Sequence, residues 1–230
     1  MKFFLVTILA AVAALVSAAG ERELSGKRRA IDMYVTNIAY QQPFSGFFIM
    51  VHDDEVPPLY KLGQNASAAL ANLAENGDPS DLVAMYEGMD GVLSAVGVPL
   101  GAGGPLFGGE TGHYTVEFTR RYRYLTVATM AVNTNDCFIA LNGKRIVEDA
   151  VYMLPGLDAG SEENNEECSS IPGPACPMNT GNEASGNGEG FVHVHRGFHG
   201  LTQGQNNGLS AQGYDWRNPM MKVVLGSQRR

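Results

Sequence analysis

The chain has 230 residues, of which 44% are hydrophobic, and its 24 acidic and 16 basic residues give a formal net charge of −8. This hydrophobic fraction can fill a folded core, which excludes general disorder. The negative charge would repel a phosphate backbone, so we expect no nucleic-acid partner.

The first 18 residues have the pattern of a secretory signal peptide. Lys2 is followed by an apolar stretch from Phe3 to Val16 and then by small residues. That stretch is too short to span a bilayer, and no later segment is long and apolar enough to do so. We therefore predict a signal peptide over 1–18, a polar linker over 19–30 and a secreted, extracellular protein without a transmembrane segment.

Most of the remaining sequence predicts short β-strands. Alternation over 31–37 indicates a half-buried strand, and the apolar run Phe47–Val51 indicates a strand buried on both faces. The Asn142-Gly143 pair is typical of a two-residue hairpin, which would join strands over 138–141 and 146–154. Other expected strands lie at 114–118, 125–132, 190–196 and 221–225. Many short strands without βαβ alternation predict an all-β, antiparallel β-sandwich.

One or two short helices interrupt the strands. Apolar residues spaced through 66–74 predict a helix with Asn65 as N-cap and Gly77 at its end, and a second begins after Asp78-Pro79. Asn65-Ala66-Ser67 is also a glycosylation sequon in an exported chain. The glycine-dense segment 101–109 lacks the Gly-Lys-Ser/Thr of a phosphate-binding loop, so we interpret it as a plain loop.

The three cysteines predict one disulfide and one buried thiol. Cys168 and Cys176 flank a proline-rich loop, and an oxidising compartment favours pairing them. Cys137 lies in an apolar run and is expected to pack as a small hydrophobic residue.

The chemically informative residues are acidic. Asp136 directly precedes an expected strand, and Asp158 and Glu162 bracket a turn in which Gly160 permits positive φ. If the predicted hairpin brings these segments together, three carboxylates meet at one end of the sandwich and repel one another unless a cation lies among them. Calcium is the expected ion, because it accepts oxygen ligands in irregular loops.

The chain resembles the spondin N-terminal domain over residues 31–226, as a stand-alone form. The motifs that carry this resemblance are Gln42-Pro43-Phe44-Ser45, Val51-His52, Gly63-Gln64-Asn65-Ala66-Ser67, Leu73-Ala74-Glu75-Asn76-Gly77-Asp78, Thr134-Asn135-Asp136, Asp158-Ala159-Gly160-Ser161-Glu162, His193-Val194-His195 and Asp215-Trp216-Arg217-Asn218-Pro219. The resemblance implies a C2-like sandwich whose calcium ligands are Asp136, Asp158 and Glu162. In the animal modules the last of these positions is Asp, so the longer Glu162 is a departure.

Two further sets of residues are candidates for a functional role. His193, His195 and His199 form an H-x-H-x-x-x-H pattern that could bind zinc if an acidic residue completed it. Trp216 is expected in the core, with Arg217 paired locally. The sequence contains neither G-x-S-x-G nor H-E-x-x-H, so we expect no enzyme.

These observations favour a secreted, calcium-binding adhesion or interaction module whose partner is an extracellular protein or glycan. The alternative is an exported carbohydrate- or lipid-binding module in which calcium bridges to the ligand.

Overall fold

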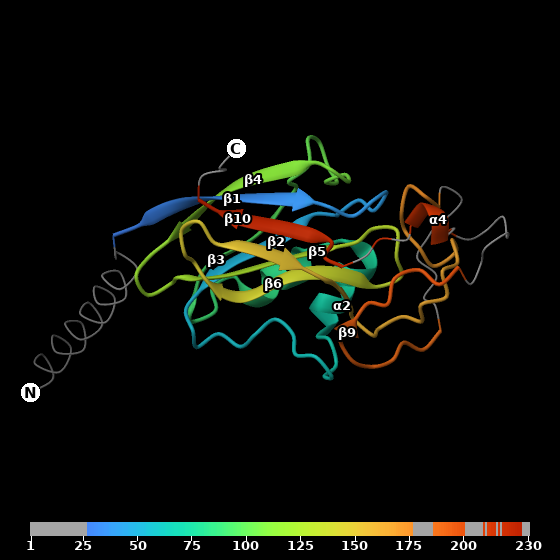
Figure 1. Ribbon diagram of the computed structural model, residues 1–230. Coiled ribbons are helices and arrows are strands. Elements are labelled where there is room, and N and C mark those ends of the chain that lie inside the picture. Colours follow the sequence, from blue (N-terminus) through green and yellow to red (C-terminus); the bar gives the residue numbers. More distant parts are fainter. Residues whose placement is uncertain are drawn as a thin grey trace, which may run out of the picture.

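The computed structural model describes residues 27–176, 186–200, 209, 211–214, 216 and 218–226. They form two antiparallel sheets packed face to face (Figure 1). The four-stranded sheet has the order β4 (Thr111–Phe118), β1 (Arg29–Asn37), β10 (Met221–Leu225), β7 (Val151–Leu154). The six-stranded sheet has the order β3 (Val92–Val98), β2 (Phe47–His52), β5 (Tyr124–Met130), β6 (Cys137–Arg145), β8 (Gly156–Asp158), β9 (His193–Val194). The predicted all-β antiparallel sandwich is confirmed.

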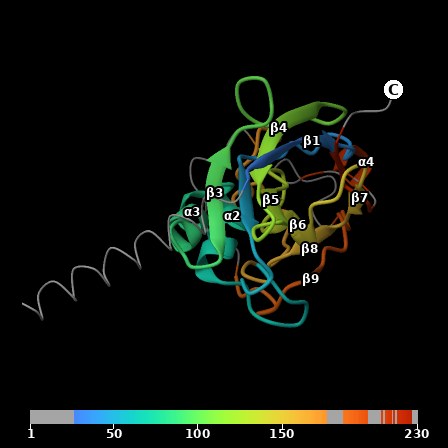
Figure 2. The same ribbon diagram turned by 90° about the vertical axis from the view of Figure 1, so that its left-hand side faces the viewer.

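The six-stranded sheet carries a hydrophobic cluster on each face. One face packs against the four-stranded sheet, and the other packs against α2 (Ala68–Asn76) and α3 (Ser80–Tyr86) (Figure 2). Every residue of β2 is buried, because alternate side chains enter the two clusters. This confirms the strand predicted from the continuous apolar run, and burial on both faces explains why that run shows no alternation.

The helix α2 forms where its apolar spacing predicts, but its N-terminus differs from the prediction. Ser67 is the N-cap and its Oγ accepts a hydrogen bond from Leu70 N at 3.2 Å, whereas Asn65 lies outside the helix and is exposed. Gly77 ends the helix in the left-handed conformation at φ 68°, as predicted. Because Ser67 provides the cap, the Asn65 side chain has no capping role that would compete with a glycan.

The hairpin predicted at Asn142-Gly143 is wrong. β6 continues through both residues, and its register against β5 shifts around Thr126. The polar groups that a turn would expose are used inside the fold. Asn142 binds the backbone of the 59–60 segment through Oδ1 and Nδ2, and Gly143 N donates to Thr126 Oγ1 at 2.9 Å. Tertiary hydrogen bonds thus convert a turn signal into a bulged strand.

Several other boundaries also differ from the sequence prediction. The strand expected over 146–154 is reduced to β7 and lies in the opposite sheet from β6. The strand expected over 190–196 is reduced to the two residues of β9, and β3 was not predicted. β1 begins at Arg29, inside the expected linker. A short helix α4 (Ala211–Tyr214) lies between β9 and β10 in the chain.

Three sequence predictions lie partly or wholly outside the described residues. These are the signal peptide over 1–18, most of the linker over 19–30, and the side chains of Asp215 and Arg217. Trp216 is described and is buried in the core, as predicted. Within the described ranges, no helix combines the length and apolar character needed to cross a membrane.

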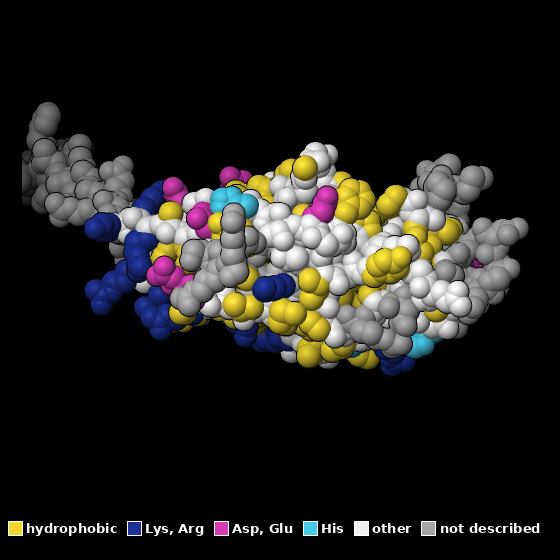
Figure 3. Space-filling view, turned by 45° about the horizontal axis from the view of Figure 1, so that its top comes forward, with side chains coloured by type: hydrophobic (Ala, Val, Ile, Leu, Met, Phe, Trp, Pro, Cys, Tyr) yellow, Lys and Arg dark blue, Asp and Glu magenta, His cyan; other side chains and the backbone are white. Residues whose placement is uncertain are grey.

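Charged side chains are unevenly distributed along the sandwich. Most of the Lys and Arg side chains visible in Figure 3 gather at the end where β1 begins. The last residues of β6, Lys144 and Arg145, lie at this end, whereas its first residue, Cys137, follows Asp136 at the opposite end. The candidate site therefore lies at the end of the sandwich away from this basic group.

Candidate cation site

Asp136 ends a buried polar turn between β5 and β6. Thr134 Oγ1 donates to Ala131 O at 2.6 Å and accepts from Cys137 N at 3.1 Å, which closes the turn. Asn133 N donates to Gln42 Oε1 at 2.6 Å. These side chains are polar yet buried, and hydrogen bonds within the protein fix the turn.

The two carboxylate oxygens of Asp136 have different environments. Oδ2 accepts hydrogen bonds from Ser161 N at 2.8 Å and Glu162 N at 3.0 Å, and a longer one from Ser161 Oγ at 3.3 Å. Oδ1 is buried and has no hydrogen-bond partner among the described residues. A buried carboxylate oxygen without a donor is costly, which makes Oδ1 a point where a proton or a cation would be stabilising.

Asp158 reaches the same place through β8. In the register of β6 and β8, Cys137 is paired with Asp158, so Asp158 lies beside Asp136 at the start of β6. Asp158 Oδ1 accepts from Gly160 N at 2.8 Å, and Gly160 has a φ of 68°. A β-carbon at Gly160 would lie 2.4 Å from Phe191 O, so this turn requires glycine.

Burial raises the pKa values of both aspartates, and a neighbouring carboxylate adds to each rise, Asp158 for Asp136 and Glu189 for Asp158. Burial raises the pKa of Asp136 to about 7, and the negative charge of Asp158 adds to this rise. Burial also raises the pKa of Asp158, against the opposing effects of its hydrogen bond from Asn164 and the nearby His193. The pair is thus difficult to ionise without a compensating positive charge.

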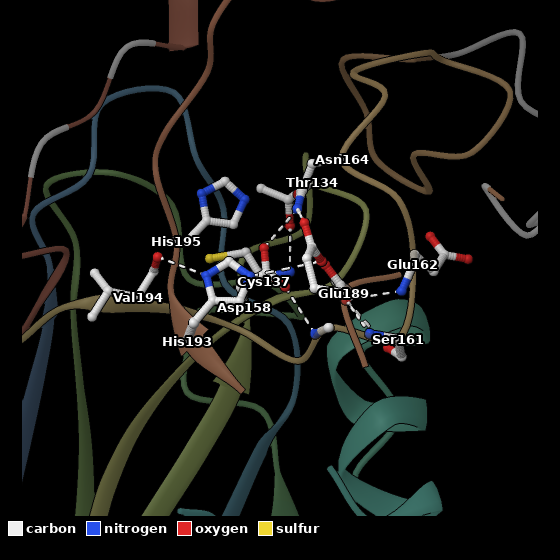
Figure 4. Close-up of polar contacts among 12 residues, drawn as sticks. Thr134, Cys137, Asp158, Ser161, Glu162, Asn164, Glu189, His193, Val194 and His195 are labelled. Carbon is white, nitrogen blue, oxygen red and sulfur yellow. Dashed lines mark hydrogen bonds and ion pairs between the residues drawn. The ribbon is translucent and has the colours of Figure 1, made fainter. Parts of the chain in front are cut away.

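A second group of ligand atoms adjoins Asp158. A carboxylate oxygen of Asp158, a carboxylate oxygen of Glu189 and a ring nitrogen of His193 lie within 4.8 Å of one another (Figure 4). His193 Nε2 is 3.5 Å from Asp158 Oδ1 and 3.7 Å from Glu189 Oε2. Asn164 Nδ2 donates to Asp158 Oδ2 at 2.7 Å and, over 3.4 Å, to Glu189 Oε1, so it holds the two carboxylates together.

Glu162, the third predicted ligand, joins the site through its backbone. Its residue is buried and its N–H donates to Asp136, but its carboxylate points away from Asp158 in Figure 4. The structure therefore brings Asp136 and Asp158 together and places the backbone of Glu162 beside Asp136, whereas the Glu162 side chain is not part of the group around Asp158.

The other two histidines of the motif differ from His193. His195 is buried, and its Nδ1 accepts from Gly197 N at 2.9 Å, so its one lone pair is already used. Burial lowers the pKa of His195 to about 3, which keeps its ring neutral. His199 is exposed and its backbone N–H donates to Glu166. Both line a cavity of about 160 Å³ that is also bounded by Asp158, Asn164, Glu189, His193 and Arg196.

The cysteines are arranged as predicted. Cys168 and Cys176 form a disulfide in the segment that follows β8. Cys137 is a free, fully buried thiol, and burial raises its pKa well above the usual value. A thiol in this environment is not activated as a nucleophile.

The sequence did not single out Glu189 or Asn164. Glu189 lies four residues before His193, a spacing that indicates proximity in a helix, whereas here the two side chains meet because the chain bends at Gly190, which has a φ of 79°. Both residues lie in a loop region without a strand or helix pattern, where acidic and amide side chains are usually solvated.

The fold and site together describe an antiparallel β-sandwich with a buried aspartate pair and an adjoining carboxylate–imidazole group at one end. Compared with models of known protein families and with curated protein sequences, the chain matches none. The spondin resemblance therefore rests on the sequence motifs alone.

Proposed function

We propose that the protein is a secreted, spondin-like interaction module in which a calcium ion at the Asp136–Asp158 end of the sandwich stabilises the binding loops. One observation carries this proposal: two adjacent buried carboxylates, one of which has an oxygen without a described hydrogen-bond partner. Calcium binding would replace the unfavourable repulsion between the two side chains by attraction to a shared ion.

The proposed ligands follow from the positions of the side chains. Asp136 Oδ1 and the Asp158 carboxylate supply the first two oxygen donors. Glu162 supplies a third if its side chain rotates toward them, and its backbone is already fixed to Asp136. Backbone carbonyls and water would complete the six to eight oxygen ligands that calcium takes. The proposal assigns the site a structural and binding role and no catalytic one.

The loops that this ion would order are the turn that ends at Asp136 and the segment that follows Asp158. The 159–162 turn is held to Asp136 by the hydrogen bonds from Ser161 and Glu162, and Gly190 N donates to Gly160 O at 2.8 Å. An ion at the aspartate pair would therefore tie three loops into one surface, which we propose contacts an extracellular protein or a glycan.

The alternative function, in which calcium bridges directly to a carbohydrate or lipid head group, is favoured by one specific feature. The cavity of about 160 Å³ reaches Asp158, so a ligand in it could approach an ion held by that carboxylate. A closed protein shell around the ion would support the structural role, and a solvent-facing ligand position would support bridging.

The test combines ion binding with partner binding. Protein treated with chelator should melt at a lower temperature than protein with calcium, and a hundredfold excess over Kd corresponds to about 2.7 kcal/mol of added stability. Asp158→Asn should abolish this difference, whereas Asp54→Asn, at an exposed acid, should preserve it. Binding to matrix proteins or to a glycan array should likewise require calcium. Equal melting temperatures with calcium and with chelator would refute the calcium site.

A further inference from the structure

The group formed by Asp158, Glu189 and His193 has a composition that calcium does not explain. It combines two carboxylates with an imidazole, and nitrogen is a ligand preferred by zinc and other transition metals over calcium. The separations also fit zinc. Ligands about 2.0–2.1 Å from a tetrahedral ion lie roughly 3.3–3.4 Å apart. The separations of His193 Nε2 from the Asp158 and Glu189 oxygens are 3.5 and 3.7 Å.

The single hydrogen bond described for the His193 ring orients it for metal binding. Nδ1 lies 3.0 Å from the carbonyl oxygen of Val194, so this nitrogen carries the hydrogen and donates it. In the neutral ring the lone pair is then on Nε2, which is buried and has no hydrogen-bond partner among the described residues. A lone pair directed at two carboxylates is repelled by them unless a positive charge lies between. A backbone carbonyl that fixes the tautomer in this way is the usual arrangement of a metal-binding histidine.

The two carboxylates are positioned for the same ion by groups behind them. Asn164 Nδ2 contacts both Asp158 and Glu189, and Gly160 N fixes the other oxygen of Asp158. The fourth side of the group opens to the cavity of about 160 Å³, where Arg196 is a lining residue. Three protein ligands and one open position are typical of zinc sites that accept water or an external ligand.

We propose that Asp158, Glu189 and His193 Nε2 bind one Zn²⁺ ion, whose fourth ligand is water or an anionic oxygen donor entering from the cavity. This site shares only Asp158 with the proposed calcium site and does not depend on that site being occupied. His195 is not a ligand, because its Nδ1 lone pair accepts the Gly197 hydrogen bond.

The experiment titrates chelator-treated full-length secreted protein with Zn²⁺, and separately with Co²⁺ as a spectroscopic substitute. We expect one Zn²⁺ per chain and a tetrahedral Co²⁺ visible spectrum that Zn²⁺ displaces. His193→Gln should weaken zinc binding roughly a hundredfold or more, because a direct ligand is worth at least as much as the 10–100-fold of an outer-shell partner. Asn164→Ala should weaken it by about 10–100-fold.

His113→Gln is the matched control. His113 Nε2 pairs with Asp32 Oδ1 at 2.9 Å on the surface of β4, and it should contribute nothing to zinc binding. Unchanged zinc affinity in His193→Gln, or the absence of a tetrahedral Co²⁺ spectrum in the unsubstituted protein, would overturn the proposal.

The same titrations separate this proposal from the calcium site. Asp136→Asn should remove calcium binding and retain zinc, His193→Gln should remove zinc and retain calcium, and Asp158→Asn should remove both. Zinc binding that depends on His193 in a protein that binds no calcium would support the zinc site and refute the proposed function.

Discussion

The substitution Asp136→Asn tests whether the buried charge of Asp136 destabilises the ion-free protein, because it removes that charge with little change of shape. The carboxamide oxygen of the variant can still accept the hydrogen bonds that Asp136 Oδ2 receives from Ser161 N and Glu162 N. The carboxamide nitrogen would take the place of Oδ1, which has no described partner, and could donate to Asp158. We therefore expect the variant to be more stable than the parent protein when chelator is present.

The magnitude follows from the pKa of Asp136. Folding raises this pKa from 3.8 to about 7, so the folded state holds the proton more tightly than the unfolded state does. When folding raises the pKa of an acid, stability is lost as the pH rises from the pKa of the unfolded state through the pKa of the folded state. This rise in pKa lowers the free energy of unfolding of the parent protein, relative to a protein with an uncharged residue 136, by about 4 kcal/mol at pH 8 and by about 2 kcal/mol at pH 5.

The assay is thermal unfolding in chelator at the two pH values. At pH 8 the variant should melt roughly 8–16 °C above the parent protein, since 1 kcal/mol shifts a domain of this size by about 2–4 °C. The advantage should shrink at pH 5, and the variant should gain nothing from calcium. Asp54→Asn, at an exposed acid, should show neither effect. A variant that is less stable than the parent at pH 8 in chelator, and that calcium still stabilises, would refute the reasoning.

Three further predictions follow from the site and its surroundings. Calcium should raise the melting temperature of the parent protein more at pH 8 than at pH 5, because the raised pKa of Asp136 lets protons compete with the ion at the lower pH. A larger increase in melting temperature at pH 5 would contradict this prediction. Gly160→Ala should lower the free energy of unfolding by at least about 2–3 kcal/mol in chemical denaturation and abolish calcium binding, because its β-carbon would clash with Phe191 O. The control Gly63→Ala, at φ 78° in open space, should lower it by about 1 kcal/mol and bind calcium normally. Secreted from a eukaryotic cell, the protein should carry a glycan that endoglycosidase removes and that Asn65→Gln eliminates. Ser67→Ala should also eliminate the glycan and should lower the free energy of unfolding by about 1 kcal/mol, because it removes the α2 N-cap. A glycan retained in Asn65→Gln would contradict the assignment.

Local sequence patterns predicted much of the fold. The buried run of β2, the alternation in β4 and the apolar stripe of α2 are each decided by a few neighbouring residues, and each formed where expected. Features decided by distant contacts were missed. Asn142-Gly143 has turn chemistry, but its groups bond to the 59–60 segment and to Thr126, and no local pattern reveals those partners.

In the candidate site, too, features decided by neighbouring residues were predicted and features decided by distant contacts were missed. Asp136 and Asp158 were expected to meet across a hairpin, and they are neighbours for a different reason, namely the antiparallel pairing of β6 with β8. Glu189 and Asn164 lie between β8 and β9, outside any strand or helix, and only the fold brings them to Asp158. The positive φ of Gly160 was predictable from its residue type, whereas its contact with Phe191 was not.

The central claim is that Asp136 and Asp158 together bind one calcium ion. Equilibrium dialysis of chelator-treated protein against radioactive calcium measures this directly, without relying on stability. We predict one calcium ion per chain in the unsubstituted protein and in Asp54→Asn, and none in Asp136→Asn or Asp158→Asn. Calcium bound in equal amounts by all four proteins, or by none of them, would contradict the account.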